Sequence, residues 1–216
     1  MSEMEFGLQA YDEMRRDGEI EGNGGSEKWQ MGGEFSIPAW GLFFGVADDG
    51  LPVVLNMDDD LPGPILINGA ASPFLMNIVN GIEHLWGRVD FGVIGSSKEW
   101  STYKNLECCA GIFGYYERGA EDLILSMAAW AHGNKGSGKY TVLLVEDFED
   151  ILRMDYEVTE KFRWLLARGP SRRVWPIVGH KGQTRFDQYF RTEILHENGS
   201  KYFMRDGDEM VGFSII

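Results

Sequence analysis

The stretch from residue 64 to residue 77, PILINGAASPFLMN, constrains the fold of this chain more than any other part of it. The apolar run Ile65–Ile67 is short and bounded by Pro and Gly, which is typical of a buried strand in a parallel sheet. Apolar residues then recur at helical spacing: Phe74, Leu75, Ile78, Val79, Ile82, Leu85 and Trp86. We expect Ser72 to cap this helix and Pro73 to be its first residue. A strand, a turn of small residues and a helix form the scaffold on which phosphate-binding loops are built.

The turn itself lacks the chemistry of a phosphate loop. The pattern G-x-x-x-x-G-K-[ST] needs a second glycine, a lysine for the phosphate charge and a hydroxyl for magnesium. Counting from Gly69 places Phe74, Leu75 and Met76 at these three positions. Because a charge-assisted hydrogen bond contributes about 1.5–3 kcal/mol, their loss weakens nucleotide binding by about two to four orders of magnitude. We therefore predict a degenerate loop, made of Gly69, Ala70, Ala71, Ser72, Phe74, Leu75 and Met76.

Composition sets the domain organisation. The chain has 216 residues, of which 44% are hydrophobic, and this is enough for one sizeable core. We expect an acidic, glycine-rich extension over residues 1–38 and one domain over residues 39–216. Within the extension, Ser2–Arg16 could form a short helix and Asp17–Ser26 a flexible link. A loosely packed extension and a tail that docks on a partner both remain open.

Charge and cysteine content limit the function classes. The net charge of −14 argues against direct binding of nucleic acid, which depends on Lys and Arg at phosphates. The two cysteines are adjacent and do not have the spacing of metal ligands. We find no apolar run long enough for a transmembrane helix and no signal peptide pattern. We therefore expect a cytoplasmic protein without membrane contact. The four histidines are too scattered for a metal site: His84, His132, His180 and His196.

Strand and helix patterns alternate along the chain, which predicts an α/β fold with a mainly parallel central sheet and short hairpins. The expected strands are Gly41–Val46, Pro52–Leu55, Ile65–Ile67, Val89–Gly95, Tyr140–Val145 and Arg173–Val178, with an Asn198-Gly199 hairpin and a last strand within residues 207–216. The expected later helices are Glu121–His132 and Val158–Arg168. A polar loop is expected after Val89–Gly95.

A second glycine-rich segment, Gly133–Tyr140, nearly matches the phosphate-loop pattern. A helix is predicted before it and a strand after it, whereas phosphate binding needs a strand before the loop and a helix after it. We interpret this segment as an ordinary helix-to-strand connection.

Acidic residues follow the strand Tyr140–Val145. Glu146 and Asp147 would lie at the carboxyl edge of the sheet, where open α/β sheets bind ligands. P-loop ATPases hold magnesium and position water with acids at such a strand end. Acids after a strand can equally cap the next helix, and the sequence favours neither role.

Several segments in order resemble the motor domain of the FtsK/HerA group of DNA translocases, which are hexameric P-loop ATPases. Residues 41–69 look like the approach to the nucleotide loop, and Val145–Ile151 looks like the motif Asp-Glu-Phe-x-Asp-Leu after a strand, with its first two acids exchanged. Leu165–Gly169 and the strand ending at His180 are similar to the segment that carries the sensor Gln, and His180 stands at the Gln position. Phe190–Ile194 looks like the late Thr-Arg-Ile strand.

The departures from this family concern one pocket: the loop, the acidic pair Glu146 and Asp147, and the sensor His180. They imply a pseudo-ATPase with a structural or regulatory role, without a cofactor, in a homo- or hetero-oligomer that could include an active relative. In such rings a neighbour can donate an Arg, and Arg168, Arg172 and Arg173 lie in the corresponding region. The alternative is a weakly active ATP-dependent translocase or nucleotide-binding protein that uses magnesium and ATP. Trp29 and Trp40 could pack the extension or anchor a partner.

Overall fold

The computed structural model describes residues 27–30, 34–38, 40–57, 63–83, 85, 87–134, 138–181 and 187–215. The predicted helix Ser2–Arg16 and link Asp17–Ser26 lie outside these residues, as do His84 and Trp86.

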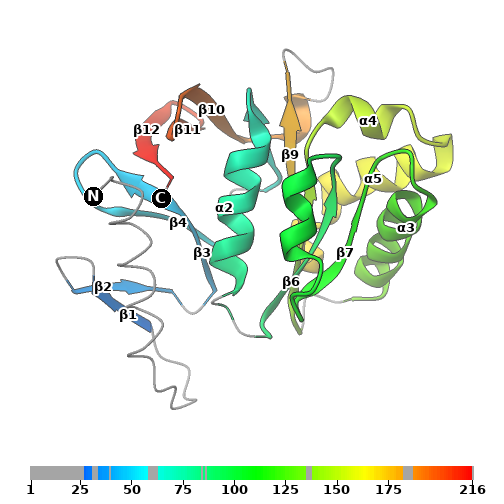
Figure 1. Ribbon diagram of the computed structural model, residues 1–216, viewed down its shortest axis with the longest axis horizontal. Coiled ribbons are helices and arrows are strands. Elements are labelled where there is room, and N and C mark those ends of the chain that lie inside the picture. Colours follow the sequence, from blue (N-terminus) through cyan, green and yellow to red (C-terminus); the bar gives the residue numbers. More distant parts are fainter. Residues whose placement is uncertain are drawn as a thin grey trace.

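Ten strands form one sheet in the order β4-β3-β12-β11-β10-β5-β9-β8-β6-β7 (Figure 1). Their bounds are β3 (Gly41–Ala47), β4 (Pro52–Asn56), β5 (Ile65–Asn68), β6 (Val89–Ile94), β7 (Cys109–Phe113), β8 (Tyr140–Val145), β9 (Val174–His180), β10 (Thr192–Asn198), β11 (Lys201–Asp206) and β12 (Glu209–Ser214). The strands from β10 to β7 in this order run parallel. The hairpins β10–β11, β11–β12 and β3–β4 continue the sheet on the other side with antiparallel pairing.

Helices cover both faces of the sheet. They are α2 (Ala71–Glu83), α3 (Arg118–Gly133), α4 (Phe148–Leu152) and α5 (Tyr156–Arg168), with 3-10 turns η1 (Lys98–Tyr103), η2 (Pro170–Arg172) and η3 (Asp187–Tyr189). α2 packs on one face, and α3, α4 and α5 pack on the other, so the buried side chains form two clusters separated by the sheet (Figure 1). This is the layered arrangement expected when parallel strands are buried on both sides.

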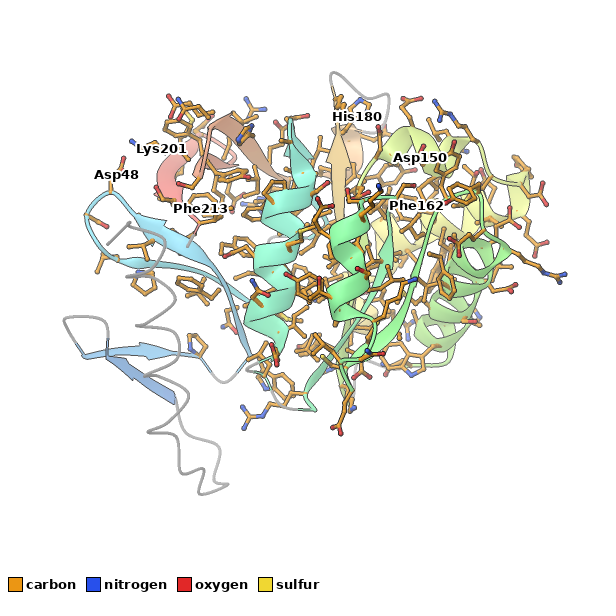
Figure 2. The ribbon with its side chains drawn as sticks, viewed as in Figure 1. Asp48, Asp150, Phe162, His180, Lys201 and Phe213 are labelled. Atoms are coloured by element: carbon orange, nitrogen blue, oxygen red, sulfur yellow. The ribbon has the colours of Figure 1, made fainter. Side chains whose placement is uncertain are left out.

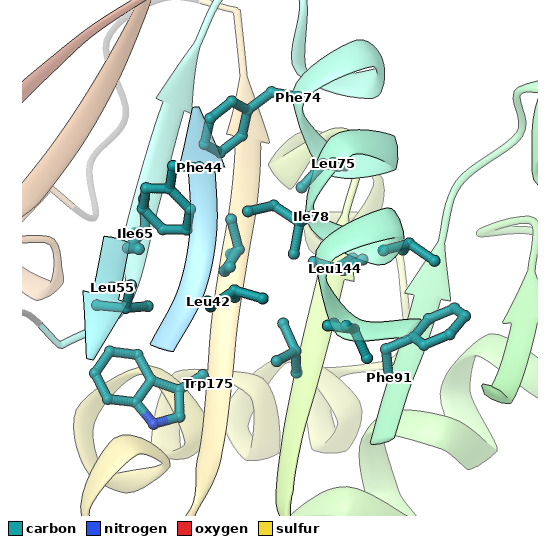
Figure 3. Packing of buried hydrophobic residues seen from close by; sticks show 14 of the residues in the cluster. Leu42, Phe44, Leu55, Ile65, Phe74, Leu75, Ile78, Phe91, Leu144 and Trp175 are labelled. Carbon is teal, nitrogen blue, oxygen red and sulfur yellow. The ribbon is translucent and has the colours of Figure 1, made fainter. Parts of the chain in front are cut away.

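The first two turns of α2 form the centre of one cluster. Phe74, Leu75 and Ile78 are fully buried and point toward the strands, where Leu42 and Phe44 of β3 meet them (Figure 3). The Phe74 ring centroid lies 5.3 Å from that of Phe44 in an edge-to-face contact. The apolar periodicity of this stretch is therefore explained by core packing.

A separate two-stranded sheet lies within the predicted extension. β1 (Glu27–Gln30) pairs with β2 (Glu34–Ile37) in antiparallel fashion, with Glu27 opposite Ile37.

The predicted fold class is confirmed, and the strands and helices predicted within the described residues form with boundary shifts of a few residues. The loop expected after β6 was wrong in part, because it contains η1 and the edge strand β7. β7 has only five residues, Cys-Ala-Gly-Ile-Phe, and its small residues give a weak strand signal.

Candidate functional site

Two residues, Gly69 and Ala70, connect β5 to α2. The Gly69 amide donates to the carbonyl of His180 on the neighbouring strand β9 at 3.1 Å. Gly69 has φ +114°, and a Cβ there would lie 2.9 Å from the Cβ of His196. Only glycine combines that backbone conformation with this close approach, so the turn is tight and held against both neighbouring strands.

The expected start of α2 was wrong by two residues, for both its cap and its first residue. The helix begins at Ala71, so Ser72 and Pro73 lie inside its first turn. Proline is tolerated there because the first amides of a helix have no intrahelical acceptor. The Ser72 hydroxyl is directed to Glu146 instead, and it donates to Oε1 of that carboxylate at 2.8 Å.

Glu146 follows the last residue of β8, and its carboxylate is surrounded by donors. Oε1 accepts from the Ser72 hydroxyl and, at 2.7 Å, from the indole Nε1 of Trp100. Oε2 accepts from the backbone amides of Ser96 at 2.7 Å and Ser97 at 3.2 Å. One carboxylate thus joins the ends of β6 and β8 to η1 and the first turn of α2.

The donors around Glu146 also determine its protonation. Burial acts to raise the pKa of this half-buried carboxyl, but the hydrogen bonds that Ser97, Ser72, Trp100 and Ser96 make to it outweigh burial. The pKa consequently lies below its ordinary value of 4.5, and Glu146 carries a negative charge at neutral pH.

Asp147 has a different role from Glu146. It is the N-cap of α4, and its side chain accepts from the Glu149 amide at 3.1 Å. Of the two roles that the sequence left open, the structure shows the capping role for Asp147, whereas Glu146 faces the β5–α2 turn.

The strand ends around Glu146 are packed closely. A Cβ at Gly179 would lie 2.2 Å from the Glu146 carbonyl oxygen and 2.4 Å from the Cβ of Ala71. A Cβ at Gly95 would lie 2.6 Å from the Glu146 carboxyl group. Glycine at both positions lets β6, β8, β9 and α2 approach each other where they meet.

The other predicted loop residues are placed away from this carboxylate. Phe74 and Leu75 are fully buried in the core, and Met76 is half-buried against the same cluster. The structure thus brings Gly69, Ala71 and Ser72 together with Glu146, while the three residues that follow Pro73 contribute to packing.

His180, the residue at the predicted sensor position, ends β9 in register with Asn68 of β5. Its side chain is 4% exposed and packs edge-on against Phe148, with ring centroids 6.3 Å apart. Neither ring nitrogen has a hydrogen-bond partner among the described contacts. Figure 2 shows His180 and Asp150 at the same edge of the sheet.

Sequence analysis missed three donors to Glu146: Ser96, Ser97 and Trp100. The available signal was their place just after the buried strand β6, because the carboxyl ends of neighbouring parallel strands lie together. The glycine-rich segment was interpreted correctly, since α3 ends at Gly133 and β8 begins at Tyr140.

No protein-family model matches the sequence, and no curated protein matches it significantly. Solved structures do match. The cytoplasmic domain of the Type VII secretion ATPase EccC from Thermomonospora curvata has a TM-score of 0.63 at 13% identity, over 82% of this chain and 28% of that one. EssC (ATPases 2 and 3) from Geobacillus thermodenitrificans has a TM-score of 0.63 at 8% identity, over 91% and 48%.

The pCW3 conjugation coupling protein TcpA has a TM-score of 0.62 at 10% identity, over 90% of this chain and 70% of that one. All three are FtsK/HerA-type P-loop ATPases. The chain has the P-loop ATPase fold. It spans less than half the length of the EccC and EssC chains that it matches.

Within this P-loop ATPase fold, two further observations concern ligands and membranes. The described residues contain no group of three or more His, Cys, Asp or Glu side chains arranged to hold a metal ion. Over the same residues, no helix combines the length and apolar character needed to cross a membrane.

Proposed function

We propose that this chain is a catalytically inactive member of the FtsK/HerA-type ATPases and acts as a structural or regulatory subunit of a protein assembly. The direct 2.8 Å hydrogen bond between Ser72 and Glu146 carries this proposal. In active P-loop NTPases the loop hydroxyl and the acid of the next motif hold a magnesium ion together. Here they bind each other, and the second carboxylate oxygen accepts two backbone amides.

The residues around this contact do not fit a magnesium-bound nucleotide. The phosphate-loop pattern spans eight residues. Counted from Gly69, six of these positions (71–76) already lie in α2, which leaves Gly69 and Ala70 for the loop. Counting forward from Gly69 puts Leu75 at the lysine position, and counting back from Ser72 puts Ala71 there. Neither alignment supplies the cation that meets the phosphates.

A patch of exposed aromatic and apolar side chains supports a role in assembly. Tyr116 is 73% exposed and Tyr156 is 79% exposed, and Leu152 lies between them in the chain at 38%. The Arg153 guanidinium lies 5.8 Å from the Tyr115 ring, so the loop before α3 lies beside the start of α5. Tyrosine is enriched at protein interfaces because it combines a large apolar area with a polar tip.

Titration with magnesium and ATP tests the loss of the nucleotide site. We expect no calorimetric signal and no change in melting temperature at millimolar nucleotide, and no phosphate release above buffer. A rise of several degrees that requires magnesium would overturn the proposal, and it would favour the alternative of a weakly active ATPase. Ser72→Ala is the matched variant: on our proposal it changes stability alone, whereas in an active site it also lowers nucleotide affinity.

Light scattering across a wide range of concentration tests self-assembly. If copies of this chain associate through the patch, Tyr116→Ser with Tyr156→Ser should shift the chain toward monomer. Tyr103→Phe, which lies in η1 on the opposite face of the sheet, is the control and should leave the association unchanged.

A further inference from the structure

A cluster of arginine and aromatic side chains lies at the amino edge of the sheet, opposite the Glu146 site. The residues that open three adjacent strands are joined there by their backbones. The Tyr140 amide donates to the Arg88 carbonyl at 3.0 Å, and the Thr141 amide donates to the Arg173 carbonyl at 2.8 Å. Arg88, Tyr140 and Arg173 therefore form one row across β6, β8 and β9.

Trp40 completes this row. Its ring meets the Tyr140 ring edge-on at 5.2 Å between centroids. The Arg173 guanidinium lies 4.2 Å from the Tyr140 ring and 5.7 Å from the Trp40 ring, and the Arg88 guanidinium lies 5.8 Å from the Trp40 ring. We call Trp40, Arg88, Tyr140 and Arg173 the amino-edge cluster.

The amino-edge cluster is positively charged on an acidic chain. The whole sequence has 34 acidic and 20 basic residues. Lys139 and Arg172 lie next to residues of the cluster in the sequence. The acidic residue Asp90 also lies near it, and its carboxylate forms an ion pair with Lys139 at 3.3 Å. Arg173 Nη1 donates to the Gly138 carbonyl at 2.9 Å. Arginine has five N–H donors in a fixed fork, which suits carboxylates.

A segment of opposite charge precedes β1 in the sequence. Residues 1–26 contain seven acids and two arginines, a net charge of −5 (2 − 7). The acids are Glu3, Glu5, Asp12, Glu13, Asp17, Glu19 and Glu21. In the β1–β2 register Glu27 lies opposite Ile37, and Ile37 precedes Trp40 by three residues, which span roughly 10 Å at most. Glu27, the first described residue after this segment, therefore lies within roughly 16 Å of Trp40, the sum of that span and one Cα pair across the ladder.

We propose that the amino-edge cluster is a docking surface for acidic peptide segments, and that residues 1–26 of the same chain occupy it. The acidic side chains of the segment meet Arg88 and Arg173, and its apolar residues extend the contact with Trp40. The extension is then held at the edge of the sheet that is remote from Glu146.

Limited proteolysis of the full chain tests this proposal, because the bond between Arg15 and Arg16 is a trypsin site inside the docked segment. We expect its cleavage, followed by mass spectrometry, to be slower than in a free peptide of residues 8–22. The double variant Arg88→Glu with Arg173→Glu should be cleaved about tenfold faster, which corresponds to 1.4 kcal/mol of lost docking energy. The control Arg118→Glu with Lys201→Glu makes the same charge change at exposed sites and should match the wild type.

A second double variant controls for misfolding of the domain, because it changes only residues of the extension. Glu19→Lys with Glu21→Lys should speed cleavage as well, and its combination with the two arginine reversals should restore protection. Protection should also weaken in 1 M salt, where the Debye length falls to about 3 Å.

Three results would overturn the proposal. The first is wild-type cleavage as fast as that of the free peptide, and the second is equal rates in the wild type and both double variants. The third is protection that grows with protein concentration together with a dimeric mass, because the segment would then occupy the cluster of a second copy.

Discussion

Glu146 is a single carboxylate that links segments far apart in the sequence. It follows β8, where P-loop ATPases place an acid for magnesium and water, and it accepts hydrogen bonds from Ser72, Trp100 and two backbone amides. The two amides, those of Ser96 and Ser97, come from the end of β6. On our proposal the carboxylate has become a structural link between strands and α2.

Replacing Glu146 with Gln tests this structural role. The amide has one acceptor oxygen and brings its own N–H donors toward the donors of the site, so some of them lose their partner. We expect Glu146→Gln to lower the free energy of unfolding by about 1–3 kcal/mol, measured by urea denaturation. Glu197→Gln, at an exposed site in β10, should change it by less than about 0.5 kcal/mol. Equal effects at the two positions would contradict the structural role.

The lowered pKa of Glu146 predicts an acid-dependent loss of stability. A carboxyl whose pKa is lower in the folded state stabilises the fold above its unfolded pKa, and that contribution disappears as the pH falls through the folded pKa. Stability should therefore decrease as the pH falls below the ordinary value of 4.5. Asp150 acts in the opposite sense, because burial and then the charge of Asp147 raise its pKa.

The difference between wild type and Glu146→Gln reports the loss of the Glu146 charge, together with the smaller effect of that charge on Asp150, whose pKa it also raises. We expect this difference, measured by urea denaturation between neutral pH and pH 3, to shrink as the pH falls. A difference that stays constant over that range would show that the charge of Glu146 is not what stabilises the fold.

At the scale of elements, α2 shows what apolar spacing can and cannot predict. The spacing of Phe74, Leu75 and Ile78 predicts the helix and its buried face, because the same residues fill the core. It does not determine where the helix begins, because Ser72 is equally suitable as a cap or as a donor to a distant carboxylate. That choice depends on Glu146, which lies 74 residues further along the chain.

The carboxyl edge was predictable in part for a similar reason. Glu146, Asp147 and His180 follow strong strand patterns, so their place at this edge can be predicted from the sequence. Trp100 is buried like an apolar side chain, but its indole N–H reaches Glu146. One side chain can have both roles, and hydropathy reports only the first.

Position 75 of α2 distinguishes an open phosphate site from a packed helix. Leu75 is fully buried, so Leu75→Lys places an unpaired charge in the core, and we expect a loss of about 3–5 kcal/mol in the free energy of unfolding. Met76→Lys is the matched variant on the next residue, where a half-buried lysine can extend its amine to water, and its cost should be smaller. A neutral or stabilising Leu75→Lys, measured by thermal or urea unfolding, would mean that position 75 faces an open pocket.

For the whole molecule, the antiparallel part of the sheet depends on the last strand of the chain. β12 pairs with β11 along its length, but with β3 it pairs only at Phe213 opposite Ala47 and Ser214 opposite Val46 in the described register. The hairpin β3–β4, which lies at the other end of the sequence, is joined to the central sheet through this short ladder. Side-chain packing must therefore supply much of the connection.

Phe213 is part of that packing, because its ring lies against Gly45 of β3, where a Cβ would be 2.9 Å from it. It is 1% exposed, and its ring lies 5.9 Å from Tyr202 of β11 and 6.0 Å from Phe74 of α2. Phe213→Ala should cost about 3–5 kcal/mol of unfolding free energy, and amide hydrogen exchange in β3 and β4 should rise more than in β8 and β9. The control Met210→Ala, in the same strand at 63% exposure, should leave both measurements nearly unchanged. If exchange instead rises equally in all strands of Phe213→Ala, the sheet unfolds as one unit and the short β12–β3 ladder does not limit its stability.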